Sequence, residues 1–156
     1  MKYLKTAICE KCDEDMPYRE DQIKMVKRHH EIGPERVPID VMEYQAFCEK
    51  CGHPVFPHEL DKKNDIIVYD AYKRKVGLLT SEDIIRIRKK RNMSQADLAR
   101  FIQCGEKNIA RYENGAVQNP VFDLLIRLVD DDKVYKEMKR IYEQRKQSVM
   151  KQSFSY

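Results

Sequence analysis

The chain has 156 residues, of which 36% are charged, and a formal net charge of +4. This length suits one domain of ordinary size or two small ones. No stretch approaches the roughly 18 apolar residues that a helix needs to cross a bilayer, and the first residues contain no apolar signal segment. The sequence therefore excludes a membrane-spanning protein and predicts a cytoplasmic one. Five cysteines in a reducing compartment favour metal binding over a disulfide framework.

The charge is unevenly distributed along the chain. Residues 1–62 contain 10 Lys and Arg against 13 Asp and Glu, a net charge of −3, whereas residues 63–156 contain 20 against 13, a net charge of +7. A basic half suggests a polyanionic partner, and an acidic half suggests a different one. Two solvated surfaces without partners would explain the same counts, so charge alone does not decide between these interpretations.

The first region, residues 1–62, predicts a small domain rich in β-strands and loops. Its clearest strand covers residues 37–47, where Val37, Ile39 and Val41 share one face. No helical stripe is evident in this region. A domain of this size buries only a modest fraction of its surface, so it needs a staple such as a bound metal.

A repeated motif supplies candidate ligands for such a metal ion. The sequence Cys-Glu-Lys-Cys occurs at residues 9–12 and again at residues 48–51. Each pair can direct two thiolates at one ion from a single tight turn, and two pairs complete the closed tetrahedral shell that zinc favours. The predicted ligands of a structural zinc ion are therefore Cys9, Cys12, Cys48 and Cys51.

Other interpretations of these residues are weaker but stay open. Iron also binds in four-thiolate sites, and the cysteines could be free thiols or a redox pair, although two identical pairs disfavour that. The histidines are interpreted as surface or loop residues because four cysteines already suffice. Cys104, outside the motif, is interpreted as a small buried apolar residue. The histidines concerned are His29, His30, His53 and His58.

The remainder of the chain is predicted to be helical. Residues 63–78 predict a linker helix that Gly77 ends, and residues 79–143 predict a domain of five helices followed by a polar tail over residues 144–156. The expected fold class is therefore α+β, with a small β-rich zinc-binding N-terminal domain, a linker helix and an all-α C-terminal domain.

Local signals mark the helices of the C-terminal domain. Residues 80–83 and 94–97 each match a capping box, in which the first and fourth residues satisfy each other's backbone at the start of a helix. A third helix is predicted over residues 106–114. Pro120 begins a fourth helix, and a fifth runs through Tyr142.

The second and third of these helices form a helix-turn-helix pattern. In the third helix, Lys107 and Arg111 lie four residues apart and share a face, whereas Ile109 and Tyr112 point toward a core. One face that packs and another that carries long cationic side chains is what a recognition helix in the DNA major groove needs. By charge pattern alone, a solvated helix in a small bundle is an equally good interpretation.

The residues that fill this pattern resemble a known family. Gln95-x-x-Leu98-Ala99, followed by Ile-Ala-Arg-Tyr-Glu-Asn-Gly at residues 109–115, resembles the Cro/C1-type (XRE) helix-turn-helix over about residues 82–142. The resemblance implies an internal ion pair between Arg88 and Glu113. It departs from the family at Gln103, where a turn glycine is usual. The implied base contacts are Lys107, Arg111 and Glu106, and the implied phosphate contacts are Gln95, Asn108 and Asn114.

Over residues 7–142 the whole chain is similar to the MqsA/YgiT-type antitoxins, which combine a zinc domain with two Cys-x-x-Cys pairs and such a helix-turn-helix. The resemblance implies that the zinc domain binds a protein toxin and that the C-terminal domain forms a homodimer and represses its operon. Lys107 lies where the family's best-known member reads DNA with an asparagine, and the insert between the cysteine pairs is longer and more charged. The first departure predicts a different operator sequence, and the second concerns the identity of the toxin partner.

Two functional hypotheses follow. The first is an antitoxin-like repressor that binds a palindromic operator in double-stranded DNA through its helix-turn-helix and a toxin through its zinc domain. The second is a stand-alone transcriptional regulator of the phage or mobile-element type, with the zinc module in a structural role. An enzyme is disfavoured because no cluster of His, Asp and Glu accompanies an open metal position. The sequence therefore predicts no catalytic residue and no small-molecule substrate.

Overall fold

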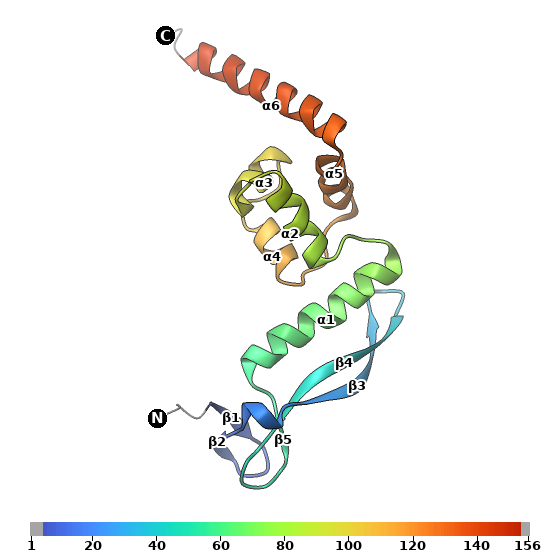
Figure 1. Cartoon of the computed structure of the whole chain (residues 1–156), viewed down its shortest axis with the longest axis vertical. Helices are drawn as coiled ribbons and strands as arrows, with labels where there is room; N and C mark the ends of the chain where they lie inside the picture. Colours follow the sequence, from blue (N-terminus) through green and yellow to red (C-terminus); the bar gives the residue numbers. More distant parts are fainter. Residues whose placement is uncertain (1–4, 154–156) are drawn as a thin grey trace. The chain divides into compact units, whose positions relative to one another are not determined.

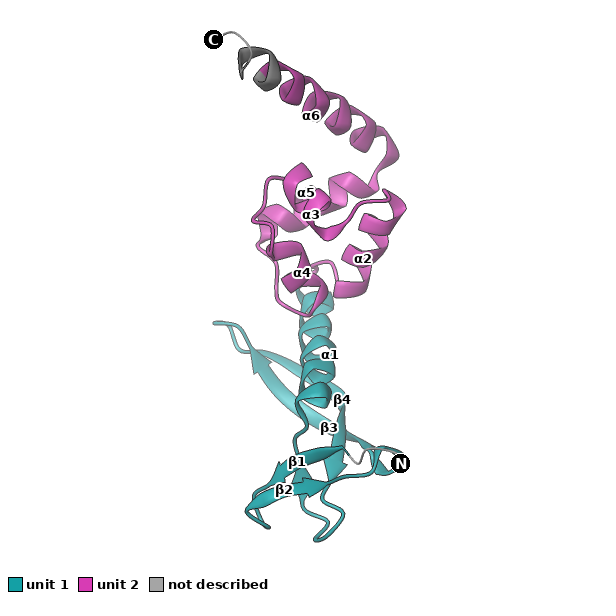
Figure 2. Ribbon diagram, turned by 90° about the vertical axis from the view of Figure 1, so that its left-hand side faces the viewer, with its two compact units in different colours: residues 1–76 teal, residues 77–156 magenta. Residues whose placement is uncertain are grey.

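The computed structural model describes residues 5–153, the side chains through residue 148, and divides the chain into two compact units (Figures 1 and 2). Unit 1, residues 1–76, contains β-strands and one long helix, and unit 2, residues 77–156, is helical. This arrangement confirms the predicted α+β class with a β-sheet N-terminal domain. No helix among residues 5–153 is both long and apolar enough to cross a membrane.

Unit 1 is built from two antiparallel sheets. Strands β1 and β2 form a two-stranded sheet, and the second sheet has the order β3-β4-β5. A single turn of 3₁₀ helix connects the two sheets, and helix α1 follows β5. The elements are β1 (Thr6–Cys9), β2 (Glu14–Pro17), the 3₁₀ turn (Glu20–Gln22), β3 (Lys24–Ile32), β4 (Val37–Phe47), β5 (Pro54–Val55) and α1 (His58–Val76).

Strand β4 shows the alternation that its sequence predicts. Ile39 is buried and its neighbours Val37 and Val41 are half-buried, whereas Pro38 and Asp40 are exposed. Helix α1 packs along this strand (Figure 1). Because β5 pairs only with the last residues of β4, most of this edge of β4 is left to α1.

Side chains of α1 complete that edge. The Asn64 side chain accepts a hydrogen bond from the Tyr44 N–H at 2.8 Å and donates one to the Tyr44 carbonyl at 2.9 Å, so its amide replaces a neighbouring strand. Lys75 Nζ donates to the Pro38 carbonyl at 2.6 Å. These bonds satisfy backbone groups that would otherwise be left without partners in the sheet.

The linker helix predicted over residues 63–78 is longer at its start and belongs to unit 1. It begins at His58, directly after Pro57, whose carbonyl accepts the N–H groups of Leu60 and Asp61. Leu60 is buried in the same core as the cysteines, which explains why the helix starts early. It ends at Val76, before Gly77, which adopts a positive φ of 78°.

Unit 2 contains the five predicted helices around one core. Its fully buried aliphatic residues are Ile84, Ile87, Leu98, Ala99, Ile109, Ile126 and Val129. The elements are α2 (Ser81–Lys90), α3 (Gln95–Phe101), α4 (Asn108–Glu113), α5 (Pro120–Asp130) and α6 (Asp132–Ser153).

Both predicted capping boxes are present. Thr80 and Asp83 exchange hydrogen bonds with each other's backbone at the start of α2, and Ser94 and Asp97 do the same at the start of α3. Pro120 is the first residue of α5, where a missing N–H costs nothing. The elements that local signals define are therefore where the sequence places them.

Two helix ends differ from the predicted ones. Helix α4 covers Asn108–Glu113 rather than residues 106–114, because the Asn108 N–H donates to the Gly105 carbonyl in a turn that precedes the helix. Helix α6 continues to Ser153, through most of the predicted tail. Residues 144–153 contain no Gly or Pro, and their Gln, Lys, Arg and Met are good helix formers, so nothing ends the helix near residue 143.

Candidate metal centre and helix-turn-helix surface

The four cysteines of the repeated motif converge on one point in unit 1. Their sulfur atoms all lie within 4.8 Å of one another. Three Sγ–Sγ distances are 3.6 Å for Cys9–Cys51, 3.9 Å for Cys12–Cys48 and 3.5 Å for Cys12–Cys51. A zinc ion with four Zn–S bonds of about 2.3 Å requires sulfur atoms about 3.8 Å apart. The donor set and its spacing therefore fit a tetrahedral four-thiolate metal ion.

The two cysteine pairs sit in equivalent backbone turns. The Asp13 N–H donates to the Cys9 carbonyl at 2.8 Å, and the Gly52 N–H donates to the Cys48 carbonyl at 2.9 Å. Both Asp13 and Gly52 adopt a left-handed conformation, with φ of 55° and 69°. The first turn joins β1 to β2, and the second joins β4 to β5. The metal centre thus connects the two sheets of unit 1.

The surroundings of Cys48 and Cys12 shift the pKa values of their thiols in opposite directions. Burial opposes ionisation of Cys48, but the backbone N–H groups of Cys51 and Lys50 more than offset it and lower the Cys48 pKa to about 7. The pKa of Cys12 is raised to about 12, primarily because its thiol donates to the Cys51 sulfur. Four thiolates this close repel one another, and a bound divalent cation removes that repulsion.

The turn after Cys9 contains backbone strain at Asp13, whereas the equivalent turn after Cys48 avoids it with Gly52. Only glycine adopts a positive φ without a steric penalty, so we expect Asp13→Gly to stabilise the metal-loaded protein by about 0.5–1 kcal/mol. The matched change, Gly52→Ala, should destabilise it by about 1 kcal/mol, because no atom lies within 4 Å of the added Cβ and only backbone strain remains. Denaturant midpoints measure both effects, and equal midpoints for Asp13→Gly and wild type would contradict the expectation.

No histidine ring nitrogen among the described residues belongs to this centre, although the His53 carbonyl accepts the Cys48 N–H at 2.8 Å. Among the described residues, the group able to hold a metal consists of the four cysteines alone. His29 Nδ1 lies 2.8 Å from the Asp40 carboxylate across the β3–β4 hairpin, and His30 contacts Glu43 in the same way.

Helix α4 and the turn before it contain the residues predicted to contact bases. Arg111 on α4 and Lys107, directly before its first residue, are exposed, whereas Ile109 and Tyr112 are buried in the core of unit 2. One side of the helix therefore packs and the other faces solvent, which is the division that base recognition in a major groove requires. Of the other predicted contacts, Glu106 and Asn114 are exposed, and Asn108 and Gln95 are half-buried.

The predicted ion pair behind this surface is confirmed. Arg88 donates two hydrogen bonds to Glu113, from Nε at 2.6 Å and from Nη2 at 3.0 Å, and a third to the Met93 carbonyl. Only 15% of the Arg88 side chain and 5% of the Glu113 side chain are exposed. The pair fixes the end of α4 to α2 in the interior of unit 2.

Two of the predicted phosphate contacts also bond within unit 2. The Gln95 side-chain amide donates to Glu113 at 2.7 Å, and the Asn114 amide donates to the Ala110 carbonyl at 2.7 Å, at the end of α4. These bonds orient the side chains at the exposed surface. Their roles toward DNA stay predictions.

Two cations at the end of α2, Lys90 and Arg91, bind the end of α5. Arg91 donates to the carbonyls of Val129 and Asp130, each at 2.8 Å, and its guanidinium lies 4.2 Å from the centroid of the Tyr135 ring. Lys90 Nζ donates to the Asp130 carbonyl at 2.7 Å. Both cations satisfy carbonyl groups at the C-terminus of α5, a pairing between distant residues that no local pattern predicts.

In the turn between α3 and α4, Gln103 takes the place of the glycine that is usual in the resembling family. This residue adopts a φ of 57°, the left-handed conformation in which the resembling family usually has glycine. Cys104, the next residue, is buried in the core as predicted, and burial raises the pKa of its thiol. The turn therefore keeps its geometry with a residue other than glycine.

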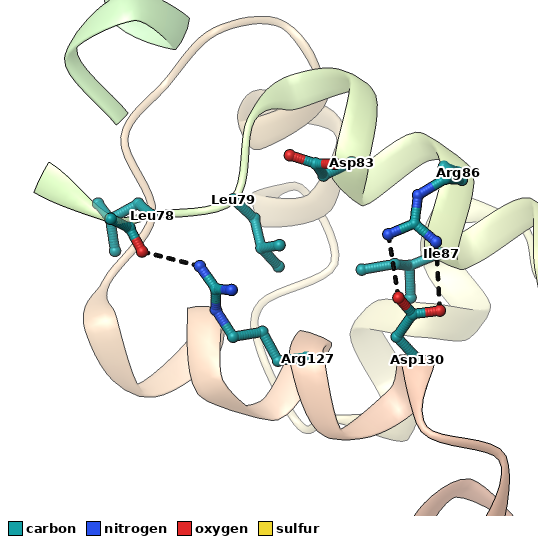
Figure 3. A pocket seen from close by; sticks show the side chains of 8 residues that line it. Leu78, Leu79, Asp83, Arg86, Ile87, Arg127 and Asp130 are labelled. Carbon is teal, nitrogen blue, oxygen red and sulfur yellow. Dashed lines mark hydrogen bonds and ion pairs between the residues drawn. The ribbon is translucent and has the colours of Figure 1, made fainter. Parts of the chain in front are cut away.

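A pocket of about 550 Å³ lies between α2 and α5 of unit 2 (Figure 3). Its charged residues are paired with each other or with the backbone. Arg86 donates two hydrogen bonds to Asp130, and Arg127 donates to the Gly77 carbonyl at 2.8 Å. These groups stabilise the helix packing, and the pocket offers no activated nucleophile or acid–base pair.

A comparison with models of protein families matches one family across the second cysteine pair and the helix-turn-helix. The model described as the antitoxin component of a bacterial toxin–antitoxin system, MqsA, matches residues 35–139, more than half of the chain. The chain belongs to the MqsA antitoxin family. No curated protein matches the chain.

Membership in the MqsA family confirms the resemblance found in the sequence. The matched residues include the second cysteine pair and the whole helix-turn-helix, whereas Cys9 and Cys12 precede them. The fold brings this first pair to the second, so the four-cysteine cluster of the MqsA-type chain is complete. The protein is an antitoxin component of a toxin–antitoxin system, and the MqsA family is one of antitoxins rather than enzymes.

Proposed function

We propose that this MqsA-type antitoxin is a homodimeric repressor that binds a palindromic operator through α4 and neutralises a protein toxin through unit 1. The observation that carries the repressor role is the surface formed by α4 and the residue before it, where Arg111 and Lys107 are exposed, while the Arg88–Glu113 pair holds the end of α4 to α2. In this proposal Lys107 and Arg111, with Glu106, contact bases, and Gln95, Asn108 and Asn114 contact phosphates. Operator binding implies action in the cytoplasm.

An uncovered apolar face supports the homodimer. On α5, Val121, Leu124 and Leu128 recur at helical spacing, and 61%, 62% and 43% of their respective surfaces are exposed. Pairing of two copies about a two-fold axis would bury this stripe against itself. A two-fold dimer presents two α4 helices, which matches the two half-sites of a palindrome, one helical turn apart.

Unit 1 has the properties of a protein-binding surface. Met25 and Tyr44 are directly opposite each other on the β3–β4 hairpin, with Met42 on the same face, and 45%, 39% and 46% of their surfaces are exposed. Lys27 lies opposite Met42 on this face, and Lys63 Nζ is 6.0 Å from the centroid of the Tyr44 ring, so the apolar patch is bordered by cations. An exposed apolar patch on a paired hairpin is a surface that a protein partner can cover.

We assign the metal as zinc, because four thiolates in a closed tetrahedral arrangement are its typical structural site. The residues that would hold it are the four cysteines of the cluster, and its contribution is to the folding of unit 1. Iron is the alternative, and metal analysis of the purified protein distinguishes the two. The stand-alone regulator is the alternative function, and family membership as an antitoxin component disfavours it.

Arg111→Ala tests the repressor role. A lost bidentate contact to a base costs about 1–3 kcal/mol at each half-site, and a dimer loses it twice, so we expect operator affinity to fall at least about 30-fold. Binding is measured by fluorescence anisotropy on DNA from upstream of the antitoxin gene and on a scrambled duplex. Arg86→Ala is the control, since its guanidinium is bound to Asp130. Unchanged operator affinity in Arg111→Ala, or an equal loss on scrambled DNA, would refute the assignment.

A further inference from the structure

Helix α6 extends beyond the part of the chain that the family shares. The match to the MqsA family ends at residue 139, whereas α6 continues to Ser153. Residues 140–153, here called the α6 extension, contain four cationic residues and one acidic residue, Glu143. The extension is therefore a basic helical segment that the shared fold does not account for. Its cations are Arg140, Arg145, Lys146 and Lys151.

Aromatic packing fixes where the extension begins. Tyr135 and Tyr142, both on α6, flank Phe101 at the end of α3, with ring centroids 5.7 Å and 5.2 Å away. Met138 lies between them and packs on the same core. These contacts hold α6 against α3 as far as Tyr142, and the side chains of residues 143–148, which follow, are exposed.

Lys146, the second cation after Tyr142, lies on the same side of unit 2 as α3. Lys146 Nζ is 5.7 Å from the centroid of the Tyr142 ring. The pKa of Asp97 on α3 is lowered primarily by hydrogen bonds from Ser94, and the charges of Arg100 and Lys146 lower it further. Lys146 therefore lies near the first turn of α3, which also contains Gln95, one of the proposed phosphate contacts.

Arg145 and Lys146 differ from the other cations of α6. Arg140 is bonded to Glu137, and Lys139 lies 3.9 Å from Glu143. Within residues 5–153, no acidic side chain forms an ion pair with Arg145 or Lys146. These two charges are therefore available to an external anion. Two copies of this segment would repel each other, which favours a polyanion over a second copy as the partner.

We propose that the α6 extension contacts DNA phosphates flanking the operator half-site through Arg145 and Lys146, and so lengthens the DNA footprint of each protomer. The inference rests on the proposed operator binding by α4. Lys and Arg that contact phosphates release condensed counterions, so each contact adds about 0.9 to the dependence of binding on salt. Such contacts raise affinity without adding base specificity.

The test compares the full-length wild type with the double variant Arg145→Gln/Lys146→Gln. Binding is measured at several salt concentrations on an operator with flanking DNA, on the same operator without flanks, and on a scrambled duplex. On the flanked operator, we expect the slope of log K against log salt to fall by about 2 per protomer, or about 4 per dimer. On the trimmed operator, wild type and variant should bind equally. The double variant Lys62→Gln/Lys63→Gln, on α1 of unit 1, removes the same charge and should leave both slopes unchanged.

Three results would overturn the inference. The first is an unchanged slope and affinity of the double variant on flanked DNA while wild type still prefers the operator, in which case operator binding stands without the extension. The second is a monomeric double variant in sedimentation beside a dimeric control, which would assign the extension to self-association. The third is a wild type that does not distinguish operator from scrambled DNA, which would remove the proposed repressor role as well.

Discussion

Cys48→Ser is expected to unfold unit 1 and leave unit 2 folded. The binding free energy of a structural zinc ion is about 10–16 kcal/mol at neutral pH, which is as large as the whole stability of a typical domain. In unit 1 the metal centre joins the two sheets, and Cys9 and Cys48 are themselves buried in the core. The core of unit 2 contains none of the four ligands, so its helices have their own source of stability.

Zinc content and NMR spectra of the full chain measure this effect. The variant should lose its bound zinc and the dispersed signals of unit 1 while retaining those of unit 2, and removal of zinc from wild type by a chelator should reproduce the pattern. Cys104→Ala is the matched control, because it replaces a cysteine outside the cluster and should keep one zinc ion per chain. A Cys48→Ser protein with an intact unit 1 would contradict the structural role of the metal.

The same three proteins test toxin binding. With lysate of the native host, wild type and Cys104→Ala should capture a partner that Cys48→Ser fails to retain. That partner should arrest growth when it is expressed alone and should lose this effect when it is co-expressed with wild type. Absence of such a toxin from a folded, zinc-loaded bait would favour the stand-alone regulator.

Arg88→Ala is expected to lower the free energy of unfolding of unit 2 by about 3–5 kcal/mol, more than the removal of any exposed charge in this unit. It removes two bonds to Glu113. That carboxylate, whose side chain is 5% exposed, then keeps the hydrogen bond from the Gln95 amide but has lost its cationic partner. An unpaired charge at such a position loses solvation that the protein no longer replaces. Because α4 depends on the pair, the variant should also lose operator binding.

Arg86→Ala is the control for this prediction. Arg86 on the same helix makes an equally direct pair with Asp130, but 53% of the Arg86 side chain is exposed, so water screens the pair and its loss should cost at most about 1 kcal/mol. Denaturant unfolding followed through the helical signal of unit 2 compares the two variants. Similar losses in both would show that burial does not determine the strength of these pairs.

Features encoded by neighbouring residues were predictable from the sequence. The capping boxes at Thr80 and Ser94 each depend on a residue three positions away, and the structure contains both. The metal cluster was predictable because each cysteine pair is local and the motif occurs twice. The Arg88–Glu113 pair, between residues 25 positions apart, was found through family resemblance rather than through any local pattern.

The predicted helix ends that are wrong involve a contact between distant residues or the absence of a stop signal. Contacts between distant residues are not encoded locally: Arg91 binds the end of α5, nearly 40 residues away, and its neighbours in the sequence do not indicate this. Helix α1 begins early because Leu60 reaches the core around the cysteines. Helix α6 passes residue 143 because neither glycine nor proline ends it there.

The position of the metal centre has a consequence for how the chain can change in evolution. The cluster ties the turn after β1 to the turn after β4, so both ends of the intervening segment are held in place independently of its length. The entropic cost of closing a loop grows only logarithmically, by about 0.6 kcal/mol for each doubling. The β3–β4 hairpin, whose tip at residues 33–36 is exposed, can therefore accept insertions and new charges while its base stays anchored. Such a segment can diversify together with the protein that it meets, without a redesign of the core beneath it.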